Sequence, residues 1–276
     1  MTYQAVSPSF NRFSNSFPSL RAGSLEVRLA QSEEEIHAAQ RLRYDVFYNE
    51  CDARPSDAMM RTKSDTSLID DYCDVLLVID HTHNKIVGTY RFMLREAAES
   101  YGSYFTASEF EINKLIVFPG QLMELGRSCV HKDYRTKATM QLLWRGIGAY
   151  VGLNQVELLF GCASFVGTDI SKYRQALSYL YHHHLAPPEL RTRALEPHYQ
   201  EMNIIPKDAI DAKVAMQQLP PLVKGYLRAG GYVGEGAFLD RPFNSIDVCV
   251  IVKRETVTTR YSQRYTQDHE GIEEKK

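Results

Sequence analysis

A glutamate and an arginine stand three residues apart in the stretch 121–147, QLMELGRSCVHKDYRTKATMQLLWRGI. Its first residues alternate with the period of a strand, and apolar residues then recur at helical spacing, with Thr136 as the predicted N-cap. A carboxylate such as Glu124 can take a proton, and the free amides of a helix N-terminus can bind an anion. On its own, however, the stretch is better explained by an ion pair of Glu124 with Arg127 beside a solvated basic turn.

The chain of 276 residues carries a net charge of -2, with 44% hydrophobic and 24% charged residues. These values are typical of a soluble globular protein and argue against nucleic acid as a partner, which would require a strong basic bias. No apolar run approaches the roughly 20 residues that span a bilayer, and residues 1–24 lack the apolar core of a secretory signal. The five cysteines are odd in number and lack CxxC spacing, which predicts a reduced cytoplasmic protein without a metal site built from cysteines.

The order of predicted elements indicates an α/β (α+β) fold, with a mixed and mostly antiparallel sheet flanked by helices. We expect a flexible arm over residues 1–24, a single domain over 25–260 and a frayed charged tail over 261–276. One parallel step joins the strand of the opening stretch to a strand at 156–163, and a ligand is expected at that switch point. Further strands are expected over 25–29, 75–79, 86–94, 232–238 and 246–252. Further helices are expected from Ser32, over 108–113, over 170–183 and from Pro220-Pro221. We expect the stretch 51–70 to be irregular and leave 186–216 unassigned.

An ordered set of motifs connects the chain to a known family. The motifs are VGTYR at 87–91, MELGRSCV at 123–130, LFGCASF at 159–165, HHHLAPPELR at 182–191 and PPLVKGYLRAG at 220–230. With them, the chain resembles the GNAT superfamily of N-acyltransferases, in the branch of L-ornithine N-alpha-acyltransferases, a branch also labelled hemolysin-like. More distantly, it resembles the acyl-homoserine lactone synthases. The resemblance covers about residues 25–265.

The resemblance implies an enzyme of lipid biosynthesis. Its expected reaction moves a (3-hydroxy)acyl chain from acyl carrier protein to the alpha-amine of L-ornithine and gives lyso-ornithine lipid. One alternative is an acyltransferase for another amino acid or an acyl-homoserine lactone synthase. The other is a non-catalytic GNAT-like protein that binds lipid. We expect the protein in the cytoplasm, with the inner face of the membrane as the alternative location.

One departure from the GNAT pattern bears on the acyl donor. Typical members open the helix after this strand with a glycine-containing loop for coenzyme A pyrophosphate, whereas residues 135–140 read RTKATM. Because glycines let backbone amides approach a pyrophosphate closely, their absence favours acyl carrier protein, whose 4'-phosphopantetheine carries one phosphodiester. The chain itself is then expected to bind no cofactor. A docking surface for this acidic carrier would comprise Lys132, Arg135, Lys137 and Arg145, which otherwise form a solvated helix face.

Given the resemblance, Glu124 is the predicted general base, and Arg127 orients it or binds the substrate carboxylate. The backbone amides of Ser128, Cys129 and Val130 would hold pantetheine and polarise the thioester carbonyl. For the amino acid, Arg43 and Arg91 are candidates for the carboxylate, with Phe47 shaping the pocket. The candidates for the ammonium are Asp70, Asp71 and Asp74, and Asn244 and Asp247 would line the acyl or acceptor side.

Three further features have structural explanations that we prefer. His182-His183-His184 lacks an aspartate four residues beyond it and is expected at a helix end rather than on a metal. Cys162 could carry an acyl group, but direct transfer and burial are the simpler expectation. The basic amphipathic helix after Pro220-Pro221 is expected to pack on the core, a peripheral membrane contact being the alternative.

Overall fold

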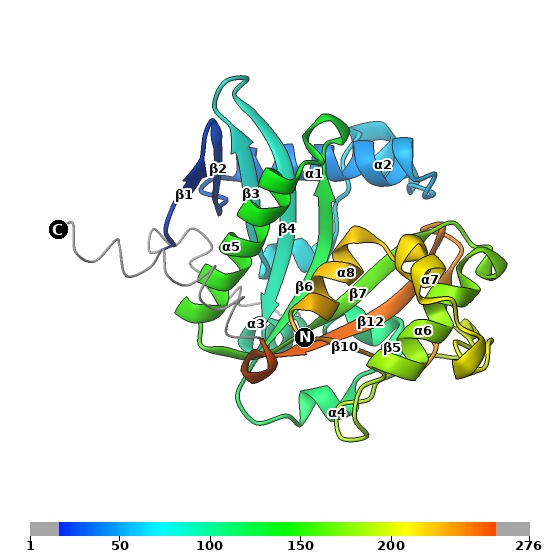
Figure 1. Cartoon of the computed structure of the whole chain (residues 1–276). Helices are drawn as coiled ribbons and strands as arrows, with labels where there is room; N and C mark the ends of the chain where they lie inside the picture. Colours follow the sequence, from blue (N-terminus) through cyan, green and yellow to red (C-terminus); the bar gives the residue numbers. More distant parts are fainter. Residues whose placement is uncertain (1–16, 258–276) are drawn as a thin grey trace, which may run out of the picture.

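A ten-stranded sheet runs through the computed structural model, which describes residues 17–257 of the chain (Figure 1). All of its strand pairs are antiparallel except β6 with β7, which are parallel. The strand order is β1 (Leu20–Ala22), β2 (Leu25–Leu29), β3 (Asp74–Asp80), β4 (Lys85–Leu94), β6 (Gln121–Val130), β7 (Val156–Val166), β12 (Ser245–Lys253), β11 (Ala237–Asp240) and β9 (Tyr199–Gln200), with β10 (Tyr232–Val233) on β12.

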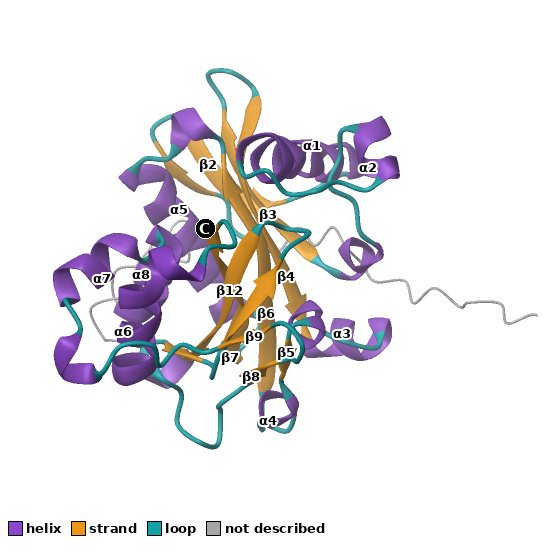
Figure 2. Ribbon diagram, turned by 90° about the vertical axis from the view of Figure 1, so that its right-hand side faces the viewer, coloured by secondary structure: helices purple, strands orange, loops and turns teal. Residues whose placement is uncertain are grey.

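Helices cover both faces of this sheet, as Figure 2 shows. One face carries α1 (Glu33–Tyr44), α2 (Asp57–Thr62) and α3 (Arg95–Tyr101), and the other carries α5 (Lys137–Leu153), α6 (Arg174–His184), α7 (Ala212–Gln218) and α8 (Pro221–Arg228). The short α4 (Asn113–Ile116) and a two-stranded sheet of β5 (Phe110–Glu111) and β8 (Arg193–Ala194) lie at one end. The predicted fold class, a mixed and mostly antiparallel sheet between helices, is confirmed.

The central unit is the parallel step β6–α5–β7. Helix α5 begins where predicted, because the Thr136 side chain accepts a hydrogen bond from the Thr139 amide. Its apolar face, which includes Leu142, Ile147 and Tyr150, is buried against the sheet. The helix therefore returns the chain to the sheet beside β6 and makes β7 its parallel neighbour.

The two parallel strands stay together only over their first residues. Their register runs from Gln121 opposite Val156 to Glu124 opposite Phe160 and then ends. At this point Gly161 lies so close to β6 that a Cβ atom there would stand 2.1 Å from the Leu125 carbonyl oxygen. Just beyond, Arg127 adopts φ of 50°, and the register of β6 with β4 shifts. The strands splay from this apex, and a cleft opens between them.

Most predicted elements are present, and the differences have local causes. The arm predicted over residues 1–24 contains β1, which pairs with β2. Residues 1–16 of this arm and the predicted tail lie outside the described residues. The stretch 51–70 holds α2, whose start is capped by the Ser56 side chain. The helix expected at 108–113 is replaced by a 3-10 turn, Phe105–Ser108, and by α4. Residues 186–216, left unassigned, hold β8, β9 and α7.

Helix α8 packs on the core, as expected from the preferred explanation of its amphipathic pattern. Val223 and Tyr226 are buried, and the Tyr226 ring meets Trp144 of α5 edge-on at 5.1 Å between centroids. The Tyr226 hydroxyl also forms a hydrogen bond with the Tyr90 hydroxyl of β4. Among the helices of residues 17–257, none is long and apolar enough to cross a bilayer.

Candidate functional site

A cleft of about 730 Å³ lies where β6 and β7 separate. One wall is the β6 segment 125–130, and the other is formed by β7 residues from Cys162 to Val166. Its rim is formed by the π-helical segment Asp45–Glu50 that follows α1, the start of α8 at Pro220–Leu222 and the turn before β12. The cleft therefore lies at the switch point of the parallel step, where the topology predicts a ligand.

The β6 wall presents backbone to the cleft. Beyond Glu124 the strand has no ladder with β7, so its amides on that side are available to a ligand. The predicted donor-binding residues Ser128, Cys129 and Val130 all line the cleft, and so does Arg135. The Arg135 guanidinium donates to the Val130 carbonyl at 3.0 Å and pairs with Glu50. One predicted docking cation is thus held at the cleft rim.

The other predicted docking cations lie farther away. Lys132 and Lys137 are exposed at the start of α5. Arg145 lies two turns further along that helix, where it reaches the Arg21 carbonyl of β1 at 3.4 Å. The structure thus keeps three of the four cations around the β6–α5 connection and directs the fourth to the edge of the sheet.

Glu124 lies beneath the cleft and is absent from its lining. Its carboxylate accepts hydrogen bonds from the Phe105 amide at 3.0 Å and from both the amide and the hydroxyl of Thr106. Burial raises the pKa of the Glu124 carboxyl, opposed by these donors. The Thr106 hydroxyl is in turn 3.8 Å from the Sγ atom of Cys162, which lines the cleft. Glu124 is thus connected to the cleft through this hydroxyl and through Phe105, which lines the cleft, and its role as base stays a prediction.

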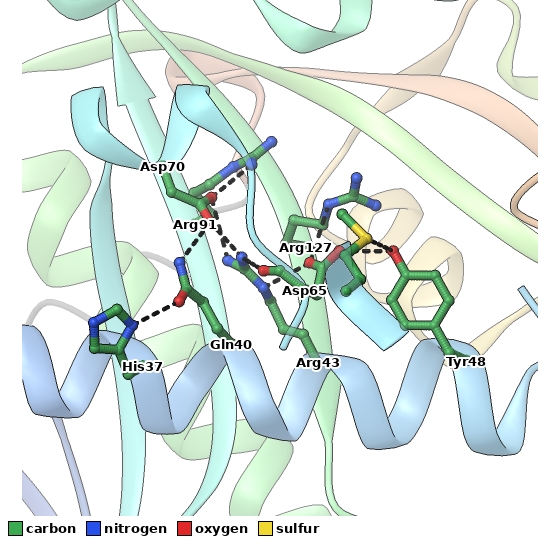
Figure 3. A network of polar contacts seen from close by, with 9 residues as sticks. His37, Gln40, Arg43, Tyr48, Asp65, Asp70, Arg91 and Arg127 are labelled. Atoms are coloured by element: carbon green, nitrogen blue, oxygen red, sulfur yellow. Dashed lines mark hydrogen bonds and ion pairs between the residues drawn. The ribbon is translucent and has the colours of Figure 1, made fainter. Parts of the chain in front are cut away.

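A buried ion network fills the space between α1 and the sheet, as Figure 3 shows. The Asp70 carboxylate receives Arg43 from α1 and Arg91 from β4, the latter at 2.9 Å. The Arg43 Nε atom lies 2.8 Å from Asp65, which also accepts the Tyr48 hydroxyl. Within this network each carboxylate faces two or more donors, so its charge is neutralised in place.

The pKa of Asp70 reflects this pairing. Burial raises it, but the guanidinium groups of Arg43 and Arg91 outweigh burial and lower the pKa of Asp70 to about 2. Gln40 adds a further hydrogen bond to the same carboxylate at 3.0 Å. Asp70 is therefore ionised at any physiological pH and already bound by protein cations.

Arg127 lies between this network and the cleft. Its Nε atom is 3.6 Å from Asp65, a loose ion pair, and its guanidinium lies over the rings of Phe47, Phe105 and Phe243 at 5.8, 5.2 and 5.0 Å. The left-handed backbone of this residue directs the side chain into the cleft, which Arg127 lines. A planar cation framed by aromatic rings is well suited to bind a carboxylate.

A second charged group lies across the cleft and contains only acids. Glu109 follows the turn that Glu124 anchors, Asp240 ends β11, and Asp247 lies on β12. One oxygen from each of the three lies within 4.8 Å of the others. One Asp247 oxygen accepts the Ser245 hydroxyl at 2.9 Å, whereas its other oxygen and one Glu109 oxygen are buried without a hydrogen-bond partner.

Both buried acids of this acidic cluster are hard to ionise. Burial, opposed by hydrogen bonds from Ser164 and Ser245, raises the pKa of Asp247 to about 6. Burial, with the neighbouring Asp247 charge, raises the pKa of Glu109 well above its usual value. Perturbed acids in a cleft are typical of functional sites.

The structure gathers only part of the predicted site. Of the predicted residues, the cleft is lined by Phe47, Arg91, Arg127, Ser128, Cys129, Val130, Arg135, Asn244 and Asp247. The three aspartates predicted for an ammonium are elsewhere: Asp70 is in the ion network, Asp74 accepts the Tyr150 hydroxyl, and Asp71 is exposed. Arg43 is also in the ion network, 1% exposed.

Glu109, Asp240 and Asp65 were not predicted from the sequence as site residues. Asp240 and Asp247 lie on the two strands of the β11–β12 hairpin, with Asp240 opposite Ser245 and Asp247 opposite Phe238. A hairpin prediction over 237–253 could therefore have placed them near one another. Nothing in the sequence near Glu109 indicates that this glutamate meets them. Asp65 stands five residues before Asp70, outside the acidic run that the sequence analysis selected.

The cysteine and the histidines fit the simpler expectations. Cys162 is half-buried, and burial followed by the Glu109 charge raises the pKa of its thiol well above the usual value. A thiol of this kind is a poor nucleophile. The three histidines end α6, where His182 contacts the Ile205 carbonyl and His183 and His184 stack near Tyr179.

Comparison with known proteins identifies relatives over most of the chain. Residues 42–145 match the acetyltransferase (GNAT) domain. An L-ornithine N(alpha)-acyltransferase of Brucella abortus is 43% identical over 89% of this chain and 90% of its own, and one of Rhodobacter capsulatus is 40% identical over 90% and 97%. The solved structure of FeeM, an N-acyl amino acid synthase from uncultured soil microbes, covers 86% of this chain and 96% of its own with 8% identity and a TM-score of 0.49.

Proposed function

The chain belongs to the family of L-ornithine N(alpha)-acyltransferases, and from this premise we propose that it transfers an acyl chain to the alpha-amine of L-ornithine. The observation that carries the proposal is the cleft at the splay of β6 and β7, where open strand backbone faces an arginine and buried acids. The proposed product is lyso-ornithine lipid, which forms when the transferred acyl chain is a 3-hydroxyacyl group.

The proposed donor is acyl carrier protein. Two features support it: residues 135–140 contain no glycine, and Lys132 and Lys137 are exposed beside the capped start of α5. The phosphodiester of the prosthetic arm would meet the helix N-terminus while these cations attract the acidic carrier. The arm would then run along the free edge of β6 toward Arg127.

The transfer itself is a direct displacement. The alpha-ammonium of ornithine loses one proton to Glu124, and the neutral amine attacks the thioester carbonyl carbon. The C–N bond forms, the C–S bond breaks, and the second amine proton goes to the departing sulfur. Backbone amides of the open β6 segment stabilise the oxyanion, because an aligned N–H group costs no reorganisation during the reaction.

In this proposal the proton reaches Glu124 through the Thr106 hydroxyl. That hydroxyl donates to Glu124 and stands next to Cys162 at the cleft wall. We expect Glu124→Gln to lower kcat by about a hundredfold, the typical contribution of a general base. Thr106→Val should lower kcat as well, whereas Thr106→Ser, which keeps the hydroxyl, should retain most activity.

A thermal unfolding measurement separates catalysis from support in these variants. If Glu124→Gln lost activity only in proportion to a fall in Tm, Glu124 would be an anchor of the Phe105–Ser108 turn and no base. Unchanged turnover in Glu124→Gln would remove it from the reaction altogether.

The product assay tests the function directly. The purified chain is incubated with 3-hydroxyacyl carrier protein and a panel of amino acids, and the products are identified by mass. We expect an amide with ornithine. If no amide forms with any amino acid, the proposed acyltransferase activity is refuted. Equal rates with acyl-coenzyme A would refute acyl carrier protein as the specific donor.

A further inference from the structure

The acidic cluster of Glu109, Asp240 and Asp247 combines burial with missing partners. Glu109 is 4% exposed and Asp247 is 2% exposed, and each has a carboxylate oxygen without a hydrogen bond. All three residues line the cleft. A buried acid oxygen without a donor costs free energy, so the arrangement is explained best by a ligand that supplies the donors.

When its acids are ionised, the cluster carries more negative charge than its surroundings balance. Arg127 is the cation that faces Glu109 and Asp247, and it is shared with Asp65. In the part of the chain that the structure describes, no ion pair joins any of the three acids to a lysine, arginine or histidine. The complementary ligand is therefore a cation with several N–H donors.

We infer that Glu109, Asp240 and Asp247 bind the side-chain ammonium of the amino-acid acceptor, with Arg127 on its carboxylate. This inference rests on the proposed function and adds the residues that select the substrate. An ammonium group has three donors and can satisfy both orphaned oxygens and Asp240 at once. With its two charged ends fixed, the acceptor would present its alpha-amine to the open segment of β6.

The inference also explains how ornithine is told from apolar amino acids of equal length. Norvaline has the same carbon chain and lacks the terminal ammonium. A site built to bind a polar substrate group rejects the analogue that lacks it by about 10⁴–10⁵ in favourable cases, because the buried polar atoms stay unpaired. Here protonation of the cluster can relieve part of that cost, so we expect a preference of about a hundredfold or more for ornithine.

The test compares ornithine with norvaline in four proteins. The wild type and the variants Glu109→Gln, Asp247→Asn and Glu111→Gln are assayed for kcat/KM with each amino acid at saturating donor. We expect Glu109→Gln and Asp247→Asn to lose most of the preference for ornithine and to leave the KM for the donor nearly unchanged. Glu111 is exposed on β5, two residues from Glu109, so Glu111→Gln should behave as the wild type.

Each outcome has a definite meaning. If the wild type acylates ornithine and norvaline equally well, or if both cleft variants keep the preference, the inference is wrong and the proposed function stands. If the wild type acylates no amino acid, the proposed function fails instead. Calorimetry with ornithine alone keeps the test independent of turnover, since the variants should lose binding without a fall in Tm.

A divalent cation is the competing occupant. Calorimetry with MgCl₂ and CaCl₂ and an assay in EDTA decide between the two. If either metal bound the wild type and not Asp247→Asn, and if EDTA abolished activity, the cluster would be a metal site and the ammonium assignment would be overturned.

Discussion

Two buried groups of charged residues lie on either side of Arg127, and they differ in how fully their carboxylates are paired with donors. On the α1 side, Asp65 and Asp70 are met by three arginines at 2.5 to 3.6 Å. On the β12 side, Glu109 and Asp247 each keep an unpartnered oxygen. The pKa values follow this difference: that of Asp70 falls to about 2, whereas that of Asp247 rises to about 6. Similar burial thus has opposite effects, depending on whether partners are present.

The comparison separates a structural role from a binding role. A carboxylate held by protein guanidinium groups cannot also hold a substrate ammonium without losing those bonds. The ion network therefore fixes α1 against β4 and positions Arg127. The acidic cluster, which lacks such partners, is the side of the cleft with capacity for a cation. Arg127 belongs to both groups and marks the boundary between them.

The largest expected effect comes from unbalancing the ion network. Asp70→Ala leaves Arg43 and Arg91 facing each other without their shared anion. Breaking a buried pair in this way costs about 3–5 kcal/mol, so the free energy of unfolding should fall by that amount. Urea denaturation followed by circular dichroism measures the change.

The exposed Asp208 provides the matched control for this substitution. Asp208→Ala should change the free energy of unfolding by less than about 0.5 kcal/mol, as is usual at the surface. If Asp70→Ala were equally mild, the network would not be the rigid support inferred from its geometry.

The fold could be predicted from the sequence because its signals are local. Alternation over 121–130, the Thr136 cap and the helical spacing that follows specify β6 and α5 without reference to the rest of the chain. The splay of the strands was not predictable in this way. It depends on the left-handed backbone of Arg127 and on the close approach of Gly161 to Leu125, both of which arise only when β6 meets β4 and β7.

The functional site was harder to predict from the sequence, because it also depends on contacts that form only in the folded protein. The family resemblance made Asp70, Asp71 and Asp74 the candidates for an ammonium, yet their side chains have separate environments. The acids that do meet come from three segments, near residues 109, 240 and 247. Sequence patterns detect spacing along one element, whereas this cluster is created by tertiary packing.

A smaller effect of opposite sign is expected in the acidic cluster. Asp247→Asn removes a buried charge that lacks a full set of donors. The pKa of Asp247 is raised from 3.8 to about 6. Because a shift of one pKa unit corresponds to about 1.36 kcal/mol, the substitution should raise the free energy of unfolding at neutral pH by up to about 3 kcal/mol. The same urea titration measures it, with Asp208→Asn as the control. A loss of stability as large as that of Asp70→Ala would mean that Asp247 is a structural anion.

The smallest effect is a pH dependence, and its sign differs between the two groups. The pKa of Asp247 is raised from 3.8 to about 6 in the folded protein, chiefly by burial, so this residue binds its proton more tightly when folded. Its contribution to stability is fully present below pH 3.8 and is lost as the pH rises through about 6. The pKa of Asp70 is lowered, so its contribution is present above pH 3.8 and is lost only as the pH falls toward 2.

Between pH 3.8 and about 6, therefore, the stability difference between Asp247→Asn and the wild type should grow with pH, by at most about 1.4 kcal/mol per unit, and it should level off above this range. Glu109 titrates together with Asp247 and spreads the rise over a wider range. Saturating ornithine should flatten it, because a bound ammonium replaces the proton as the partner of the cluster. A difference that stayed constant with pH in the absence of ornithine would show that Asp247 does not titrate there, and the contrast with Asp70 would be lost.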